Sequence, residues 1–404
     1  SGAGALNVDY KNRTVEIDGV KLKEGDYISI NGSTGEVYEG EVHTKAAELS
    51  GDFADLMTLA DKYARLKVRT NADTPHDAQS ARNFGAVGIG LCRTEHMFFE
   101  GEKIKAMREM ILAENAEDRK KALAKILPYQ QDDFKGILRV MAGYPVTVRL
   151  LDPPLHEFVP HDEKGQQEMA EAMGVSLAYI RQRVEALHEQ NPMLGHRGCR
   201  LGNTYPEITQ MQTRAILGAA LDLKKEGVET HPEIMVPLTG ILYEFKEQET
   251  VIRAEAEALF AERGDRIDFL VGTMIEVPRA ALTADRIATS AEFFSFGTND
   301  LTQMTFGYSR DDIASFLPIY LHKKILKVDP FQVLDQKGVG SLIRMATERG
   351  RSVRPTLKCG ICGEHGGEPS SVKFCHKVGL DYVSCSPFRV PIARVAAAQA
   401  AIEE

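Results

Sequence analysis

Apolar and polar residues alternate along this chain with two different periods, and the period changes near residue 43. Before that point, the short segments Thr14–Ile17, Tyr27–Ile30 and Glu36–Tyr38 alternate apolar and polar side chains and are separated by turn-forming residues. This pattern predicts short antiparallel strands. Because about 40 residues of hairpins rarely bury a core of their own, we expect residues 1–42 to be the β-rich tail of a domain whose body lies upstream.

From residue 43 to residue 65 the apolar residues follow a helical period. Phe53, Leu56, Leu59 and Tyr63 recur at spacings of three and four, which predicts a linker helix. Residues 66–404 then form the main domain, in which strand-like and helix-like segments alternate.

The main domain contains eight candidate strands, and eight strand–helix units favour a closed (β/α)8 TIM-type barrel over an open doubly wound sheet. The stretches 100–143 and 161–190 are longer than one barrel helix requires, so we expect extra helices there. One strand is uncertain, because Gly198–Leu201 is short and Tyr382–Ser386 competes for its place. The candidates are Lys67–Asn71, Gly88–Arg93, Val146–Leu151, Gly198–Leu201, Glu233–Leu238, Val271–Glu276, Phe293–Asp300 and Lys358–Glu364.

Composition narrows the class of protein. The chain is 43% hydrophobic and 26% charged with a net charge of −9, so it lacks the basic surplus typical of nucleic-acid-binding proteins. It contains no apolar run of membrane-spanning length and no signal-peptide pattern, so we expect no membrane partner. Six cysteines, several of them inside apolar runs, suit a reducing compartment. We therefore expect a cytoplasmic protein, although an organellar form stays open.

Three arginines lie in or at the end of apolar or glycine-rich segments. Arg93, Arg149 and Arg197 would be costly to bury unless each guanidinium meets an anion. Several guanidiniums directed into one pocket suit a phosphoryl group. For each arginine alone, a structural ion pair with Asp152 or Glu95 is an equal alternative.

Two carboxylates end consecutive predicted strands. Glu276 and Asp300 would face each other across neighbouring strand ends, and Mg²⁺ in proteins commonly takes one or two carboxylates together with substrate oxygens. The alternative for Asp300 is a helix N-cap. The preceding Gly297, Thr298 and Asn299 add backbone N–H groups and a side-chain amide, which are suited to an oxyanion.

Cys359 and Cys362 form one Cys-x-x-Cys pair, with His365 three residues further on. A structural zinc site needs four ligands, and the chain contains no second pair of matching spacing. We expect Cys362 to be an acid at the mouth of the barrel, and Cys359 to be an inert buried residue.

Several of these motifs together resemble the pyruvate, phosphate dikinases of the phosphoenolpyruvate-utilising enzyme family. The resemblance covers nearly the whole chain. Phosphoenolpyruvate synthase and Enzyme I of the sugar phosphotransferase system share the Arg-Thr-Glu and Gly-Thr-Asn-Asp elements, and the synthase stays the close alternative. The motifs are Leu-Cys-Arg-Thr-Glu-His at 91–96, Asp-Pro-Pro-Leu-His-Glu-Phe at 152–158, Gly-His-Arg-Gly-Cys-Arg at 195–200, Gly-Thr-Asn-Asp at 297–300 and Cys-Gly-Ile-Cys-Gly-Glu-His at 359–365.

The resemblance implies a barrel that interconverts pyruvate and phosphoenolpyruvate by exchanging a phosphoryl group with a histidine on a central domain, and it implies a homodimer. It further implies the site residues that the matching positions carry. Neither the phosphohistidine loop nor an ATP-binding domain is recognisable in the 404 residues, so we expect this chain to bind substrate without running the ATP-dependent reaction. By the resemblance, Arg93 and Arg149 hold the phosphoryl group and Arg197 assists. Glu276 and Asp300 bind Mg²⁺, Gly297, Thr298 and Asn299 contact substrate, and Cys362 moves the proton.

Two other classes of function stay open. A Mg²⁺-dependent carbon–carbon lyase would also pair a glutamate and an aspartate around an enolate, although it has little use for three arginines. A non-catalytic binding module is the other alternative. Exchange of the methyl protons of pyruvate with solvent would separate the binding module from an enzyme.

Overall fold

The computed structural model describes residues 7–9, 12–17, 19–31, 36–43, 49–98 and 101–404. The chain divides into two compact units, residues 1–48 with 311–325 and residues 49–310 with 326–404. The predicted turns at Asp18 and at residues 32–35, and residues 44–48 of the predicted linker helix, lie outside the described residues.

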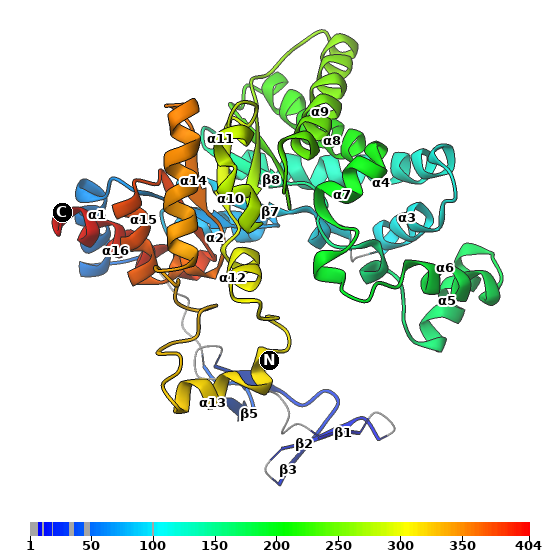
Figure 1. Cartoon of the computed structure of the whole chain (residues 1–404). Coiled ribbons are helices and arrows are strands. Elements are labelled where there is room, and N and C mark those ends of the chain that lie inside the picture. The colour runs from blue at the N-terminus through cyan, green and yellow to red at the C-terminus, as the bar shows by residue number, and fades with distance from the viewer. Residues whose placement is uncertain (1–6, 10–11, 18, 32–35, 44–48, 99–100) are drawn as a thin grey trace. The chain divides into compact units, whose positions relative to one another are not determined.

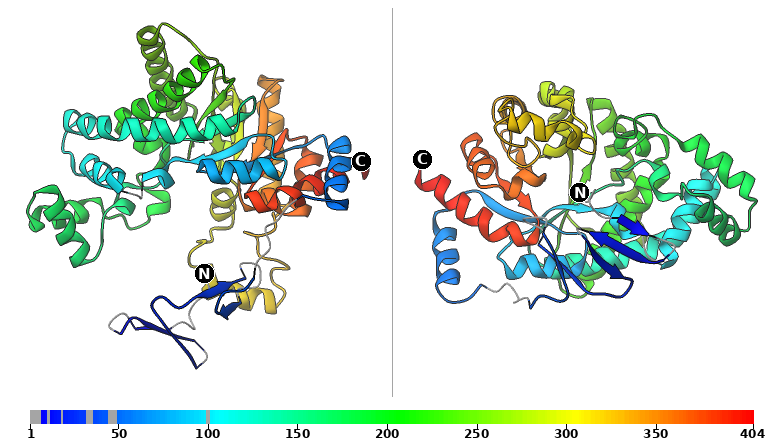
Figure 2. Two further views of the ribbon diagram at one scale, coloured as in Figure 1. Left: turned by 180° about the vertical axis from the view of Figure 1, so that it is seen from behind. Right: turned by 90° about the horizontal axis from the view of Figure 1, so that it is seen from below.

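The smaller unit contains the short strands that the alternating pattern predicts. Strands β1 (Asn7–Asp9), β2 (Thr14–Ile17) and β3 (Val20–Lys23) form an antiparallel sheet, and β4 (Ile28–Ile30) pairs with β5 (Val37–Glu39). Figure 2 shows these strands in dark blue. The 3-10 helix η4 (Ile313–Ser315) and helix α13 (Leu317–His322) belong to the same unit.

The larger unit is built on a closed barrel of eight parallel strands, which confirms the predicted fold class (Figure 1). The strands follow one another around the barrel in chain order, and the last pairs with the first. They are β6 (Lys67–Asn71), β7 (Ile89–Arg93), β8 (Pro145–Arg149), β9 (His231–Val236), β10 (Leu270–Ile275), β11 (Phe293–Phe296), β12 (Lys358–Ile361) and β13 (Tyr382–Cys385).

One predicted strand is wrong. Residues Gly198–Leu201 open helix α7 (Gly198–Thr204), and β13, which lies between β12 and β6, is the eighth strand of the barrel instead. Gly198 has φ 57°, a left-handed conformation that costs glycine little and that turns the chain into the helix. Local composition favoured a strand there, but a stretch of four residues is too short for its pattern to distinguish the two.

Helices surround the barrel, and the two long stretches contain the expected extra helices. The first holds α3 (Gly101–Leu112) and α4 (Ala116–Val140), and the second holds α5 (Glu163–Met173) and α6 (Leu177–Leu187). No helix of the described residues is long and apolar enough to span a bilayer. The remaining helices are α1 (Asp52–Tyr63), α2 (Pro75–Asn83), α8 (Pro206–Lys225), α9 (Leu242–Arg263), α10 (Pro278–Leu282), α11 (Ala284–Ile287), α12 (Thr298–Phe306), α14 (Val339–Val353), α15 (Pro369–Val378) and α16 (Val390–Ile402), with 3-10 turns η1 (Thr94–Phe98), η2 (Leu155–Phe158), η3 (Pro192–Leu194), η5 (Glu364–Gly367) and η6 (Pro387–Arg389).

Helix α1 confirms the predicted helical period, but the apolar stripe that defined it faces outward. The stripe residues Phe53, Leu56, Leu59 and Tyr63 are 44–54% exposed. Met57 and Ala60 are the buried residues of the helix, which packs against α16.

The barrel interior is layered. Arg69, Thr147 and Glu233 meet in a buried polar group near the N-terminal ends of the strands, where Arg69 Nη1 lies 2.9 Å from Glu233 Oε2. Above them, Leu91, Met235, Met274, Phe293 and Cys362 form an apolar cluster separate from the main core. Because side chains alternate along each strand, these inward residues close the barrel beneath its C-terminal rim.

Candidate active site

Five of the predicted site residues lie at or directly after the carboxyl ends of barrel strands. Arg93 ends β7 and Arg149 ends β8, and the two are register partners. Glu276 directly follows β10, Gly297 follows β11 and Cys362 follows β12. Parallel strands bring these ends to one rim, so the predicted convergence is present.

Two of the arginines share one buried carboxylate. Asp152 Oδ2 lies 2.8 Å from Nη1 of Arg149 and 2.5 Å from Nη2 of Arg197. Arg149 also pairs with Glu95. Burial works against the charged form of Arg149, but Asp152 and Glu95 outweigh it and raise the pKa of the guanidinium. The structural ion pairs that the sequence left open are therefore formed, and they hold both guanidiniums at the rim.

Arg197 reaches the site from an unexpected element. It is the N-cap residue of α7 rather than a strand residue, and Asp152 fixes that turn, because its carbonyl oxygen accepts a hydrogen bond from Gly198 N at 2.8 Å. Nη2 of Arg197 also lies 3.4 Å from Asp300 Oδ2. Arg197 thus connects the arginine group to the predicted metal carboxylates.

Arg93 is held by a residue that sequence reasoning missed. Asp73 accepts a hydrogen bond from the backbone N–H of Arg93 at 2.5 Å, and its other oxygen lies 3.9 Å from Nη1 of Arg93. The same carboxylate contacts His96 Nδ1 at 2.7 Å, and that hydrogen bond raises the pKa of His96. Arg93 is more exposed than the other two arginines, which leaves its guanidinium accessible at the rim.

Glu276 and Asp300 form a carboxylate pair with perturbed protonation. Burial, and then the nearby Asp300 and Asp152 charges, raise the pKa of Glu276 well above its usual range. Burial also raises the pKa of Asp300, although Arg197 opposes the effect. Two carboxylates that resist ionisation side by side are suited to a shared cation.

A strained backbone position orients Glu276. Leu238, two residues beyond β9, has φ 59°, and its N–H donates a hydrogen bond to Glu276 Oε1 at 2.7 Å. A left-handed conformation at a residue with a branched side chain is unfavourable and persists only where the surroundings impose it. The unfavourable conformation thus occurs at Leu238, the residue whose N–H orients the Glu276 carboxylate.

The Gly-Thr-Asn-Asp turn packs against both neighbouring strand ends. A Cβ atom on Gly297 would lie 2.3 Å from Glu276 Oε2, so only glycine permits this approach. Thr298 is fully buried, and its Oγ1 lies 2.7 Å from His365 Nδ1. Asn299 Oδ1 accepts a hydrogen bond from Glu364 N at 3.3 Å. Any substrate contact of Thr298 would therefore come from its backbone.

Cys362 lies beneath the rim with its thiol protected. It belongs to the apolar cluster inside the barrel, and its N–H donates to Phe296 O at 3.2 Å. Asn71, at the end of β6, donates from Nδ2 to the carbonyl oxygen of Cys362 at 3.3 Å. Burial raises the pKa of Cys362 to about 11, so the thiol is protonated at neutral pH. All six cysteines are free and buried.

The side chains at the strand ends can be compared with the ligands that Mg²⁺ takes in proteins. Among the described residues, no group of three or more His, Cys, Asp or Glu side chains is arranged to hold a metal. Among the side chains described at this rim, Glu276 and Asp300 are the candidate carboxylates, and a pair of carboxylates suits Mg²⁺ completed by substrate oxygens and water. His365 has both ring nitrogens within hydrogen-bonding distance of protein oxygens, namely Thr298 Oγ1 and Pro330 O.

Sequence reasoning missed Asn71, Asp73 and His365 as site-forming residues. Each is a single polar residue that contacts a partner distant in sequence. The only available signal was their position, because Asn71 and Asp73 follow a predicted strand and His365 lies in the Cys-Gly-Ile-Cys-Gly-Glu-His motif.

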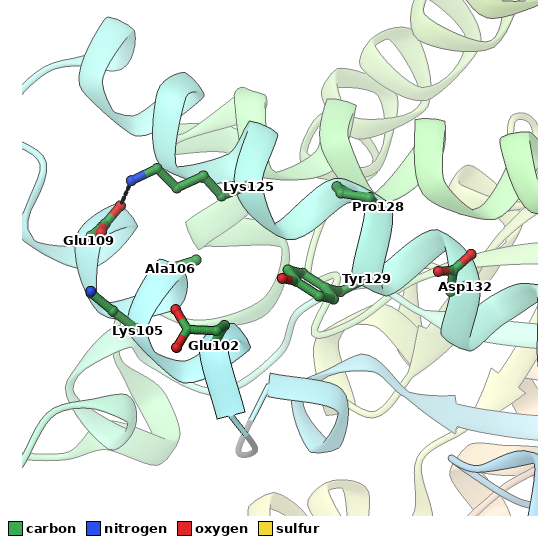
Figure 3. A pocket seen from close by; sticks show the side chains of 8 residues that line it. All are labelled: Glu102, Lys105, Ala106, Glu109, Lys125, Pro128, Tyr129 and Asp132. Carbon is green, nitrogen blue, oxygen red and sulfur yellow. Dashed lines mark hydrogen bonds and ion pairs between the residues drawn. The ribbon is translucent and has the colours of Figure 1, made fainter.

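A surface hollow of about 550 Å³ lies between α3 and α4 and is separate from the strand-end group in its lining (Figure 3). An ion pair between Lys125 and Glu109 crosses it. Its walls mix acidic and basic side chains with Tyr129, and none of the predicted site residues lines it.

Comparison with known proteins shows the family to which the chain belongs. The family described as "PEP-utilising enzyme, PEP-binding domain" matches residues 47–402. The chain is 58% identical over its whole length to pyruvate, phosphate dikinase of Clostridium symbiosum, 59% to pyruvate, phosphate dikinase 1, chloroplastic, of Arabidopsis thaliana, and 58% to pyruvate, phosphate dikinase of Rhizobium meliloti. It spans 46%, 42% and 45% of those proteins. The chain belongs to the family of PEP-utilising enzymes, and the match covers their PEP-binding domain.

Proposed function

We propose that this chain binds phosphoenolpyruvate and pyruvate at the C-terminal rim of the barrel, and interconverts them by exchanging a phosphoryl group with a phosphohistidine on another domain. The observation that supports this most is one connected network: Arg149 and Arg197 share Asp152, and Arg197 reaches Asp300. A group that binds phosphate thus lies next to a group that suits a cation. Relatives named pyruvate, phosphate dikinase support the choice of substrate.

The arginines bind and orient the phosphoryl group. Arg149 and Arg197 are held rigidly by Asp152, while Arg93 is less buried and can turn toward the ligand. Guanidinium groups that are positioned in advance neutralise the charge on transferred phosphoryl oxygens without reorganising during the reaction.

Cys362 moves a proton at the methylene carbon of the substrate. When the phosphoryl group leaves the enol oxygen of phosphoenolpyruvate for the histidine, the remaining enolate takes the thiol proton at C3 and becomes pyruvate. A thiol with a pKa of about 11 holds its proton for this step. In the reverse direction the Cys362 thiolate removes a methyl proton, and the enolate oxygen attacks the phosphohistidine.

Glu276 and Asp300 are the residues that would hold Mg²⁺. When bound there, the ion would polarise the carboxylate and enol oxygens of the substrate and offset the charge that develops on them. Leu238 N–H and the close approach of Gly297 keep the Glu276 carboxylate in place for this role.

Calorimetric titration with phosphoenolpyruvate tests the proposal. We expect the wild-type chain to bind with Mg²⁺, and to lose the binding heat when EDTA removes the metal. Glu276→Ala and Arg149→Ala should abolish binding while remaining folded by circular dichroism. Arg214→Ala, which breaks an ion-pair group on α8 and α9, is the matched control and should bind as the wild type does. Equal binding by the Glu276 or Arg149 variant would place the site elsewhere.

Two further expectations accompany this proposal. The chain alone should not form phosphoenolpyruvate from ATP, phosphate and pyruvate, because it covers less than half of each of these three relatives; ATP-dependent product from the purified chain would overturn this. We also propose a homodimer, following the resemblance, which sedimentation velocity of the purified chain would test.

A further inference from the structure

We propose that His365 is a positioning residue for catalysis: it fixes the Gly-Thr-Asn-Asp turn to the loop that carries Cys362. The inference rests on the proposed function, because it concerns how that site is kept in register. It also gives a role to a histidine that the sequence alone offered only as a weak metal ligand.

The geometry around His365 defines which hydrogen bond each ring nitrogen makes. Nε2 lies 2.9 Å from the carbonyl oxygen of Pro330, which can only accept, so Nε2 must carry a hydrogen. In the neutral ring Nδ1 is then an acceptor, and Thr298 Oγ1, 2.7 Å away, donates to it. The imidazole is fully buried, and burial lowers its pKa, which favours this neutral form.

The two loops approach each other too closely for this contact to be incidental. A Cβ atom on Gly363 would lie 1.9 Å from Thr298 Oγ1 and 3.2 Å from Asn299 N. Two more hydrogen bonds cross the same gap, from Glu364 N to Asn299 Oδ1 and from Cys362 N to Phe296 O. We call this set of contacts between residues 296–299 and 362–365 the loop clasp.

The loop clasp joins the two parts of the proposed chemistry. One side holds Asn299 and leads to the carboxylate of Asp300, and the other holds the thiol of Cys362. Proton transfer to the substrate carbon requires the thiol and the bound substrate to keep a separation defined to a fraction of an ångström. His365 is the side chain that links the turn both to the Cys362 loop and to Pro330.

Two conservative substitutions each keep one of the two hydrogen bonds of the His365 ring and remove the other. His365→Asn places an amide oxygen near the position of Nδ1, so it can still accept from Thr298 but cannot reach Pro330. His365→Gln extends to the position of Nε2, so it can donate to Pro330 but leaves Thr298 without its acceptor. If His365 positions the turn, the Gln variant should lose more affinity for phosphoenolpyruvate than the Asn variant does.

We expect His365→Gln to weaken Mg²⁺-dependent phosphoenolpyruvate binding by about 2- to 12-fold, the range that one hydrogen bond supports, and His365→Asn to weaken it less. Deuterium exchange at the amides of residues 298–301 should rise in the same order. Thr298→Val should reproduce the Gln variant, and adding it to His365→Gln should have little further effect. Thr298→Ser keeps the hydroxyl that Thr298→Val removes, so it should match the wild type in affinity and in amide exchange.

His376→Gln is the matched control, because His376 is buried in α15 and contacts Glu404 Oε2 at 3.0 Å. It should change neither ligand affinity nor exchange at the turn. Equal affinities for the two His365 variants, a reversed order, or unchanged exchange at residues 298–301 would overturn the proposal. A wild-type chain that binds no phosphoenolpyruvate would instead overturn the proposed function, and the exchange measurements would still decide whether the loop clasp depends on His365.

Discussion

Asp152 is the residue on which the arrangement of the arginines depends, and Asp152→Ala tests that dependence. The carboxylate lies within 2.8 Å of both Arg149 and Arg197, and all three side chains are buried. Removing one member of a buried ion pair costs about 3–5 kcal/mol, because a charge remains without its partner. Glu95 and Asp300 still contact the two guanidiniums, so we expect a loss in this range rather than twice as much.

This loss in the free energy of unfolding corresponds to a fall in the melting temperature, Tm. The larger unit spans residues 49–310 and 326–404, about 340 residues, and an unfolding entropy of about 2.1 cal/mol/K per residue turns 3–5 kcal/mol into a fall in Tm of about 4–7 °C. Differential scanning calorimetry at low ionic strength measures this fall. Glu207→Ala, which breaks the buried pair between Arg119 and Glu207 on α4 and α8, provides a matched loss outside the site.

Inorganic phosphate distinguishes the two variants. In Asp152→Ala an added anion can take the place of the missing carboxylate between Arg149 and Arg197, so phosphate should raise the Tm of this variant more than that of Glu207→Ala. Two results would refute the reasoning: a Tm within about 1 °C of the wild type, or an equal response of both variants to phosphate.

Two other predictions concern the remaining strand ends. Gly297→Ala should weaken Mg²⁺-dependent phosphoenolpyruvate binding in calorimetry, because its Cβ would lie 2.3 Å from Glu276 Oε2; unchanged affinity would show that the carboxylate does not need this approach. Alkylation of Cys362 by iodoacetamide, followed by peptide mapping, should be about 100-fold slower at pH 7 than for a thiol with a pKa of 9.0, because burial favours the neutral form and raises the pKa to about 11. The alkylation rate should rise tenfold per pH unit up to about pH 11, and a plateau below pH 9 would contradict the raised pKa.

Much of the barrel could be predicted from the sequence, because buried parallel strands consist of short runs of apolar residues that can be recognised locally. Seven of the eight predicted strands overlap observed ones, and the polar residues that end them, Arg93, Arg149 and Glu276, meet at one rim as expected. This success depends on a property of the fold: the strand end fixes the location of a residue without any knowledge of its contacts.

The rest depended on contacts that leave no local pattern. Arg197 was expected inside or at the end of a glycine-rich strand segment. It enters the site from the start of α7 instead, because Gly198 turns the chain and the carbonyl oxygen of Asp152 accepts a hydrogen bond from the Gly198 N–H. The role of His365 could not be inferred either, since its partners Thr298 and Pro330 lie 67 and 35 residues away along the chain. The lack of a second cysteine pair argued against a zinc site at this motif, and in the structure both ring nitrogens of His365 lie within hydrogen-bonding distance of protein oxygens.

The charges around the site give a physical reason to expect that the proposed metal and the proposed anionic substrate bind together. Three arginines face five carboxylates, which leaves a formal excess of two negative charges: Arg93, Arg149 and Arg197 against Asp73, Glu95, Asp152, Glu276 and Asp300. Part of this excess is relieved by the raised pKa of Glu276. An anionic substrate would nevertheless meet a negative field, and a divalent cation between Glu276 and Asp300 would cancel it.

Thermodynamic linkage relates the affinity for Mg²⁺ to the affinity for phosphoenolpyruvate. If Mg²⁺ increases the affinity for phosphoenolpyruvate by some factor, phosphoenolpyruvate must increase the affinity for Mg²⁺ by the same factor. Titrating each ligand in the absence and presence of the other measures both factors. In Asp300→Asn the formal excess falls to one negative charge, so substrate should bind more readily without metal while the gain from metal shrinks. If the variant instead bound phosphoenolpyruvate without metal no better than the wild type does, the Asp300 carboxylate would not be repelling the substrate.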